Sequence, residues 1–538
     1  MARQPKGPRV TQAAKIEKKL DGLMSLLNTT HQLPPNAAII ASGSGLISSE
    51  PSDGGPHSAG PSTKTPNSTE STSHGGGHQG NPSEAETVSF SSVVDGVFLD
   101  HEADRLLDIY RNSLVMRCPF VVISTDMPAW QVRQDTPFLF LTILFATSYE
   151  NCPRQHILGD EIMKYVSEHL LLKGERSLDL LQGLLVYITW YHYHVSGPLQ
   201  INLFLQLLIA VLTDLGLNRA SVARETQDAL FNQIKQQDPC AANPLPMSNA
   251  TYRAVIGCFY LSSTITSTSS KLDPMPYTSH IEDCLQSLAV ANEYNADFIL
   301  VQMVKLQKIV EDIRCSALHS ASSMKGLVDL YVKAFQRSLQ DYKTALPPGL
   351  QQNTSILLHY HSAEIQLYQV GFQMPQVVEE NLKFQRMEIL SACLSATKGF
   401  CAAWLSIPPS LYYTLSLGNF GQLTRALLVF LKLCVFHAED WDAPRIRQQA
   451  NLSFIIDEMI NRMEEASITF GRNHSSCPFM KSVTNLKLGK SWYERELGKS
   501  SVEEDISMDL NGGSADAAVL WSQLDAWNED LWGGFMAS

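Results

Sequence analysis

The chain has 538 residues, of which 44% are hydrophobic, and a formal net charge of -13; this length exceeds a single ordinary core, so one large domain or two fused helical layers are expected. An acidic chain is not expected to coat nucleic acid with its whole surface, although a local basic element can still bind it. The 10 cysteines include no CxxC pair, which excludes a zinc site of the usual spacing.

Residues 1–30 are predicted to form a basic segment and a short coiled-coil helix. Apolar residues recur there at the spacing of a coiled-coil seam, although an amphipathic helix that frays or docks on the body is the alternative. The basic residues fit a nuclear import signal, an arm that contacts phosphates, or a solvated terminus. No apolar stretch of a secretory signal follows them, so an intracellular protein is expected. The seam residues are Ile16, Leu20, Leu23 and Leu27, and the basic residues are Arg3, Lys6, Arg9, Lys15, Lys18 and Lys19.

Residues 31–92 are rich in Ser, Gly, Pro and Thr, which predicts a disordered linker. Residues 93–470 are predicted to form an all-α regulatory body, because segments of helical period follow one another and clear period-two strands are missing. Thr136-Pro137 is expected to open a strongly apolar helix, since proline fits the first turn. A first helix is expected over 100–114, proline-rich breaks at 346–349 and 407–410, and later helices over 248–263, 294–316, 323–342, 354–370, 386–404, 422–437 and 450–465.

The most apolar stretch, Leu178 to Leu217, is predicted to be a buried pair of helices. Gly197-Pro198 is expected to end the first helix, and the second is expected to start near Gln200. The run from Leu199 onwards is nearly long enough to cross a bilayer. Polar residues interrupt it and no basic flank follows the positive-inside rule, so a core hairpin is favoured over a membrane span.

Residues 471–538 are predicted to form an acidic-aromatic tail that is partly disordered. Tryptophan and leucine recur there on one face of a short helix, with acidic residues between them. Such a segment is typical of an interaction motif that folds in the groove of a partner. The alternative is a C-terminal helix that docks on the body. The residues of this predicted activation tail are Trp521, Leu524, Trp527, Leu531 and Trp532.

The sequence contains no Walker-type phosphate loop, GxGxxG, HExxH or GxSxG motif. The HxH pairs His192/His194 and His359/His361 are expected on helices, where residues two apart point to different faces; packed or rim histidines are therefore favoured over metal ligands. Asp100 and Asp104 resemble the Asp-rich magnesium motif of all-α prenyl-diphosphate enzymes, but His101 replaces a second Asp. No catalytic, cofactor-binding or metal residue is predicted.

Several motifs, taken in order, resemble the regulatory domain of fungal zinc binuclear-cluster transcription factors. The resemblance covers roughly Val93 to Glu465 and implies a helical regulatory domain. The motifs that carry it are Pro137-Phe138-Leu139, 177–186 with Trp190-Tyr191-His192-Tyr193, 214–219, 253–263, 357–361 and Trp441-Asp442.

In that family, an N-terminal cluster of six cysteines holds two zinc ions and places a helix in the DNA major groove. Residues 9–28 are similar to the segment that normally follows the cluster, whereas Met1 to Pro8 contain no cysteine. The resemblance therefore implies either a regulator without its own DNA reader or a chain that begins downstream of one. Zinc is expected only if an upstream cluster is missing from this sequence.

The function predicted from this resemblance is that of a nuclear transcriptional regulator of fungal type, not an enzyme. It is expected to act as a homodimer, or as a heterodimer with a zinc-cluster paralogue, and to recruit the transcription machinery. The family also implies control of a neighbouring biosynthetic gene cluster. One alternative is a helical scaffold or dominant-negative partner without promoter association, and a further one is an all-α magnesium-dependent enzyme.

Overall fold

The computed structural model describes residues 100–117, 119–193, 200–219, 247–268, 272–320, 328–374, 380–436, 438, 441–469 and 477–503. These residues all lie in one compact unit. The predictions for the coiled coil, the linker and the aromatic motif of the tail lie outside the described residues.

Helices form this part of the chain, which confirms the predicted all-α fold. The ranges given above contain no strand, and an isolated bridge pairs Ala438 with Trp441. A helical fold is the outcome that the sequence pattern favours, because apolar residues recur with a period near 3.6 along most of the body.

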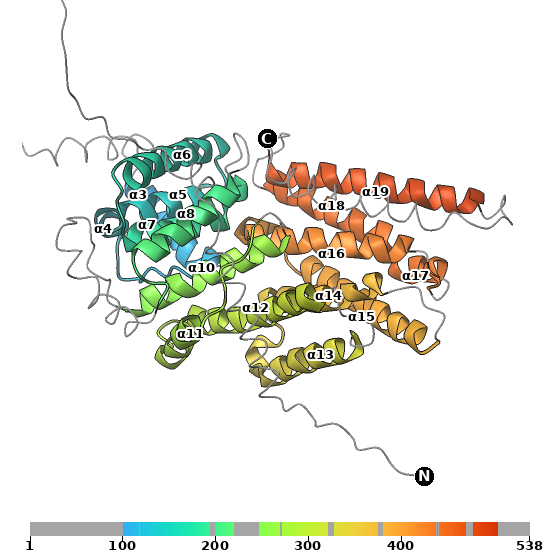
Figure 1. Ribbon diagram of the computed structural model, residues 1–538. Coiled ribbons are helices and arrows are strands. Elements are labelled where there is room, and N and C mark those ends of the chain that lie inside the picture. The colour runs from blue at the N-terminus through green and yellow to red at the C-terminus, as the bar shows by residue number, and fades with distance from the viewer. Residues whose placement is uncertain are drawn as a thin grey trace, which may run out of the picture. The chain divides into compact units, whose positions relative to one another are not determined.

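The N-terminal helices gather around α5, which contacts α3, α4, α6 and α7 (Figure 1). Every residue of α5 from Phe138 to Thr147 is buried, so this helix is the centre of its layer. The bounds are α3 Asp100–Ile109, continued by a π-helical turn Tyr110–Leu114, α4 Ala129–Asp135, α5 Pro137–Thr147, α6 Cys152–Tyr165, continued by a π-helical turn Val166–Leu172, α7 Leu178–Thr189, a 3-10 turn Tyr191–Tyr193, and α8 Ile201–Asp214.

The start of α5 depends on a residue of α7. Pro137 occupies the first turn, as predicted from the Thr136-Pro137 pair. The carboxylate of Asp179 then accepts hydrogen bonds from the backbone N–H groups of Phe138 at 3.1 Å and Leu139 at 2.7 Å. Burial raises the pKa of Asp179 to about 6, although these two hydrogen bonds favour its ionised form. Asp179 thus caps the most buried helix of the layer from the neighbouring helix.

The helix pair predicted over Leu178 to Leu217 is confirmed as α7 and α8, but its first helix ends earlier than expected. α7 ends at Thr189, before Gly197-Pro198, because the chain turns at Trp190 and continues as the 3-10 turn. Both helices pack against each other and against α10. Among the described helices, none is long and apolar enough to span a membrane.

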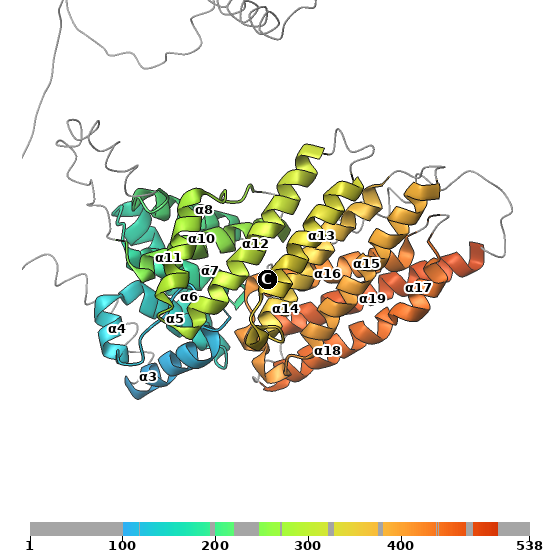
Figure 2. The same ribbon diagram turned by 90° about the horizontal axis from the view of Figure 1, so that it is seen from below.

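The C-terminal half is a set of long helices that lie side by side. In Figure 2 the long helices of this half run in roughly the same direction; α14 packs on α13 and α15, α15 packs on α16, and α18 packs on α19. The bounds are α10 Asn249–Thr268, α11 Ser279–Ala291, α12 Asn295–Ser320, α13 Val328–Ala345, α14 Thr354–Tyr368, α15 Glu380–Leu405, α16 Leu417–Val435, α17 Ala443–Ala450, α18 Leu452–Thr469 and α19 Pro478–Glu503.

The predicted breaks at 346–349 and 407–410 fall between helices, where the structure has 3-10 turns at Pro348–Leu350 and Pro409–Thr414. Among the described helices, α4, α6, α11, α17 and α19 were not predicted. α19 lies within residues 471–538 and packs on α16 and α18, so the helical packing continues to Glu503.

Candidate functional site

The residues that the sequence analysis proposed for dimerisation, for basic contacts and for activation lie outside the described residues. Their roles therefore stay predictions. These residues are Ile16, Leu20, Leu23 and Leu27, then Arg3, Lys6, Arg9, Lys15, Lys18 and Lys19, and finally Trp521, Leu524, Trp527, Leu531 and Trp532.

The histidines of the second HxH pair lie on α14 and have different partners. The buried His359 ring donates from Nδ1 to the Ser355 carbonyl at 2.6 Å, and its Nε2 accepts from the Tyr260 hydroxyl. Burial lowers the pKa of His359 to about 4, so its ring is neutral at pH 7. His361 instead contacts Glu364, with 2.8 Å between Nδ1 and Oε2. The two histidines thus face different neighbours, as the helical spacing predicted.

One residue of the Asp100/Asp104 pair, Asp104, has a structural role. Asp104 accepts a hydrogen bond at 2.9 Å from the backbone N–H of Ala129, the first residue of α4. Its carboxylate therefore fixes the start of a neighbouring helix. The described residues contain no group of three or more His, Cys, Asp or Glu side chains placed to hold a metal ion.

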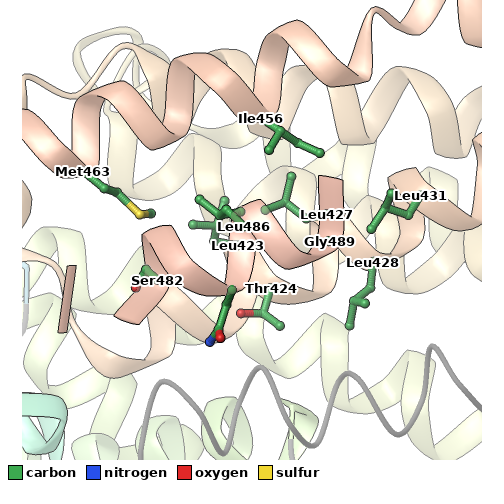
Figure 3. Close-up of a pocket in the computed structure, with 11 residues that line it drawn as sticks. Leu423, Thr424, Leu427, Leu428, Leu431, Ile456, Met463, Ser482, Leu486 and Gly489 are labelled. Carbon is green, nitrogen blue, oxygen red and sulfur yellow. The ribbon is translucent and has the colours of Figure 1, made fainter. Parts of the chain in front are cut away.

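An apolar pocket lies between α16, α18 and α19 (Figure 3). Leucines from α16 and α19, with Ile456 and Met463 from α18, form most of its wall, and the polar side chains of Thr424, Ser482 and Asn485 complete it. The Asn485 Nδ2 atom is buried and has no hydrogen-bond partner in the described part of the chain. The lining residues are Leu423, Thr424, Leu427, Leu428, Leu431, Ile456, Met463, Ser482, Asn485, Leu486 and Gly489.

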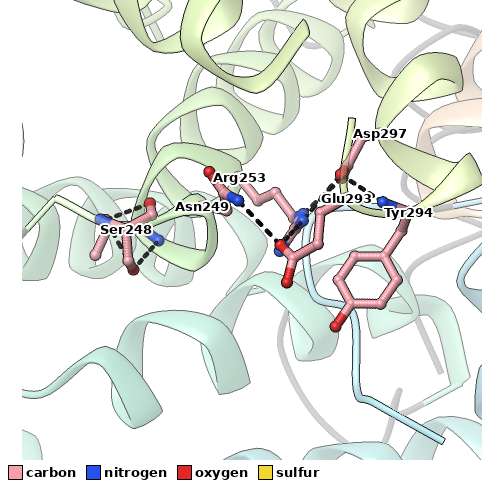
Figure 4. A network of polar contacts seen from close by, with 7 residues as sticks. Ser248, Asn249, Arg253, Glu293, Tyr294 and Asp297 are labelled. Carbon is pink, nitrogen blue, oxygen red and sulfur yellow. Dashed lines mark hydrogen bonds and ion pairs between the residues drawn. The ribbon is translucent and has the colours of Figure 1, made fainter. Parts of the chain in front are cut away.

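An ionic cluster around the buried Arg253–Asp297 pair joins α10 to the start of α12 (Figure 4). The Arg253 guanidinium donates to both carboxylate oxygens of Asp297, at 2.6 and 2.9 Å, and to Glu293 at 2.6 Å. The Tyr294 backbone N–H donates to Asp297 at 3.0 Å, and Arg253 also lies over the Tyr294 ring. Because every charge in the cluster has a partner, it is a structural element and not a ligand site.

A polar pocket of about 280 Å³ lies where the first helical segment meets the start of α14. It is lined by Asn112, Ser113, Met116, Arg117, Ile299, Asn353, Thr354, Ser355, Leu411 and Thr414. Asn112 and Met116 are exposed at its rim, so the pocket is accessible from solvent. Its volume suits a small organic molecule better than a nucleotide or a peptide.

Arg117 supplies the positive charge of this pocket. Its Nη1 donates to the Ser355 hydroxyl at 2.8 Å, and no carboxylate within the described ranges is at ion-pair distance from it. Burial lowers the pKa of Arg117, because no negative charge offsets the loss of hydration. The pocket therefore holds a desolvated cation that a small anion would stabilise.

The start of α14 adds backbone donors to the same pocket. Asn353 caps the helix by accepting from the N–H of Ile356, which leaves the N–H groups of Thr354 and Ser355 without an acceptor inside the helix. Such groups, together with the positive end of the helix dipole, favour an anion. Sequence reasoning missed this pocket, because Arg117 and Ser355 are 238 residues apart; the cap signal Asn353-Thr354-Ser355 was the only local hint.

Comparison with known proteins gives two matching families. Residues 83–402 match the family described as the WAR1 C-terminal domain. Residues 409–534 match a second family, described as a C-terminal domain. No solved structure matches the chain.

Curated relatives include transcription factor opdL of Penicillium oxalicum, 27% identical over 78% of this chain and 77% of its own length. Transcription factor himD of Aspergillus japonicus is 28% identical, over 78% of this chain and 71% of its own. Weak acid resistance protein 1 of Saccharomyces cerevisiae is 20% identical, over 63% of this chain and 39% of its own.

Proposed function

Since the chain belongs to the family of fungal transcription factors that share the WAR1 C-terminal domain, and is a transcriptional regulator of fungal type, we propose that it works in the nucleus through DNA and protein partners and not through catalysis. Residues 93–470 form its regulatory body, and residues 1–30 and 471–538 carry its partner contacts. By analogy with the family, its targets are genes of a biosynthetic cluster.

Dimerisation is assigned to the apolar seam of residues 1–30. Ile16, Leu20, Leu23 and Leu27 pair with a second copy or with a zinc-cluster paralogue, which brings the body to DNA. The six basic residues of the same segment contact phosphates or direct nuclear import. The coiled-coil spacing and the basic composition support both parts of this proposal.

The tail is assigned to recruitment of the transcription machinery. A fusion of residues 501–538 to a neutral DNA-binding module is expected to activate a reporter, because Trp527 and Trp532 supply the large apolar area that dominates such contacts. Trp527→Ala with Trp532→Ala is expected to lower reporter expression about tenfold or more. Equal expression from both fusions would remove this role and favour a helical scaffold or dominant-negative partner.

The polar pocket is assigned to a small carboxylate effector. The observation that carries this assignment is the Arg117 guanidinium, which lies beside the first turn of α14 without a carboxylate partner among the described residues. The name of one relative, weak acid resistance protein 1, refers to weak acids, the chemical class to which such an effector belongs. A bound carboxylate would accept from Arg117 and from the Thr354 and Ser355 N–H groups.

This assignment predicts that short monocarboxylates such as acetate and benzoate raise the melting temperature of the full chain. Arg117→Met is expected to weaken their binding about 10- to 100-fold, because one charge-assisted hydrogen bond is lost. The variant itself is not expected to melt earlier, since it removes a desolvated cation. Binding is measured by calorimetry.

Arg462→Met serves as the matched control, because Arg462 is a partly buried arginine on α18 whose main partner is Glu458. This variant is expected to bind carboxylates like the wild type. If no carboxylate binds the wild-type chain, or if Arg117→Met binds equally well, the effector assignment is wrong. The regulatory function would then stand without it.

A further inference from the structure

The apolar pocket between α16, α18 and α19 has features of a docking site. Its wall is mostly leucine, with Leu423, Leu427, Leu428 and Leu431 from α16 and Leu486 from α19, so it offers apolar side chains for an aromatic segment to pack against. Asn485 also lines this pocket. Its buried Nδ2 atom has no partner among the described residues and could donate a hydrogen bond to an occupant of the pocket.

Two cations without acidic partners among the described residues are next in sequence to residues that line the pocket. Arg425 follows the lining residue Thr424 on α16, and Lys481 precedes the lining residue Ser482 on α19. Neither forms an ion pair within the ranges that the structure describes, and burial lowers the pKa of both side chains. Nearby cations such as Lys487 and Lys490 are instead paired with Glu464 and Asp457. An occupant of the pocket should therefore be apolar and acidic at once.

The tail of the chain has this composition. Trp521, Trp527 and Trp532 alternate with Asp525, Glu529 and Asp530. The second matching family covers residues 409–534 in one run, so a single domain includes both the helices of the pocket and this aromatic motif. A tail that works only in the groove of a separate partner would not need to belong to the domain that forms the pocket.

The segment between α19 and the aromatic motif is long enough for the motif to reach the pocket. The chain leaves α19 at Glu503, about 14 residues beyond Gly489, which corresponds to about 21 Å along the helix. The roughly 17 residues from Glu504 to Leu520 can extend over about 55 Å. The aromatic motif can therefore return to the pocket within the same chain.

We propose that residues 521–532 dock in the same chain on the pocket of α16, α18 and α19, with the tryptophans against the leucines and the acidic residues beside Arg425 and Lys481. Docking withholds the motif from the transcription machinery until the body releases it. This regulation rests on the proposed activating role of the tail. The reporter fusion of residues 501–538 tests that role separately, because the fusion lacks the pocket.

Hydrogen exchange of the full chain, followed by mass spectrometry, tests the docking. Amides of residues 521–532 are expected to be protected in the wild type and to exchange about tenfold faster in Trp527→Ala with Trp532→Ala. Arg425→Gln with Lys481→Gln is expected to shift exchange in the same direction, since it removes the two charges that the proposal pairs with the acidic residues of the tail. Protection of α5 and α7 is the check that each variant is folded.

Trp130→Ala is the matched control, because Trp130 is 66% exposed and lies on α4. It should leave exchange of the tail unchanged. Tail amides that exchange at the rate of an unstructured peptide in the wild type, or that ignore the tryptophan substitutions, would overturn the proposal. Protection that grows with protein concentration would also overturn it, because the occupant would then be the tail of a second copy.

Discussion

Replacing Arg253 with Met is expected to lower the free energy of unfolding by about 3–5 kcal/mol. The substitution keeps the apolar stem but removes the charge that neutralises Asp297, whose side chain is 1% exposed, and Glu293. Within the described part of the chain, the Asp297 carboxylate would then keep only the hydrogen bond from the Tyr294 backbone N–H. An unpaired buried carboxylate is costly, so the loss should exceed that of an ordinary surface ion pair.

Chemical denaturation of the full chain, followed by far-ultraviolet circular dichroism, measures this loss. Arg253→Lys should fall between wild type and Arg253→Met, because lysine keeps the charge but cannot bind both oxygens of Asp297 in parallel. Arg462→Met is the control; its pair with Glu458 is partly exposed and should contribute less than about 1 kcal/mol. A cost for Arg253→Met equal to this control would show that the cluster does not hold α10 and α12 together.

The sequence predicted helices best where one physical signal dominated. Thr136-Pro137 and the apolar run after it located α5, and the amphipathic segment over 354–370 located α14. α6 and α11 were missed, although both carry local start signals: Asn151 caps α6 ahead of Pro153, and Thr278 caps α11. In both helices polar residues dilute the apolar period, so the caps were the better signal.

The sites were harder to predict because long-range contacts create them. Nothing near Arg117 in the sequence indicates that Ser355 will lie beside it, and the Arg253–Asp297 pair joins residues 44 positions apart. Histidine spacing, by contrast, is a local property, and it predicted that His359 and His361 have different neighbours. Local periodicity therefore predicted which elements form, whereas the pockets depend on how those elements pack.

Tight packing between α5 and α7 makes Gly183 the most sensitive small residue of the predicted central stretch. A Cβ atom built there would lie 2.3 Å from Cδ1 of Phe138. The Phe138 ring is fully buried and stacks on Tyr165 with 4.9 Å between centroids, so it has little room to move. Gly183 thus gives up helix propensity to let the two helices approach closely.

Gly183→Val is therefore expected to lower the free energy of unfolding by about 3 kcal/mol or more, and Gly183→Ala by less, since alanine regains about 1 kcal/mol of helix propensity. Gly349→Ala is the matched control, because a Cβ atom there meets nothing within 4 Å. Denaturation midpoints measure all three variants. Phe138→Leu should recover part of the loss in Gly183→Ala, giving a coupling of about 1 kcal/mol or more between the two sites. Strictly additive effects would mean that the Phe138 ring is not what limits the approach of α5 and α7.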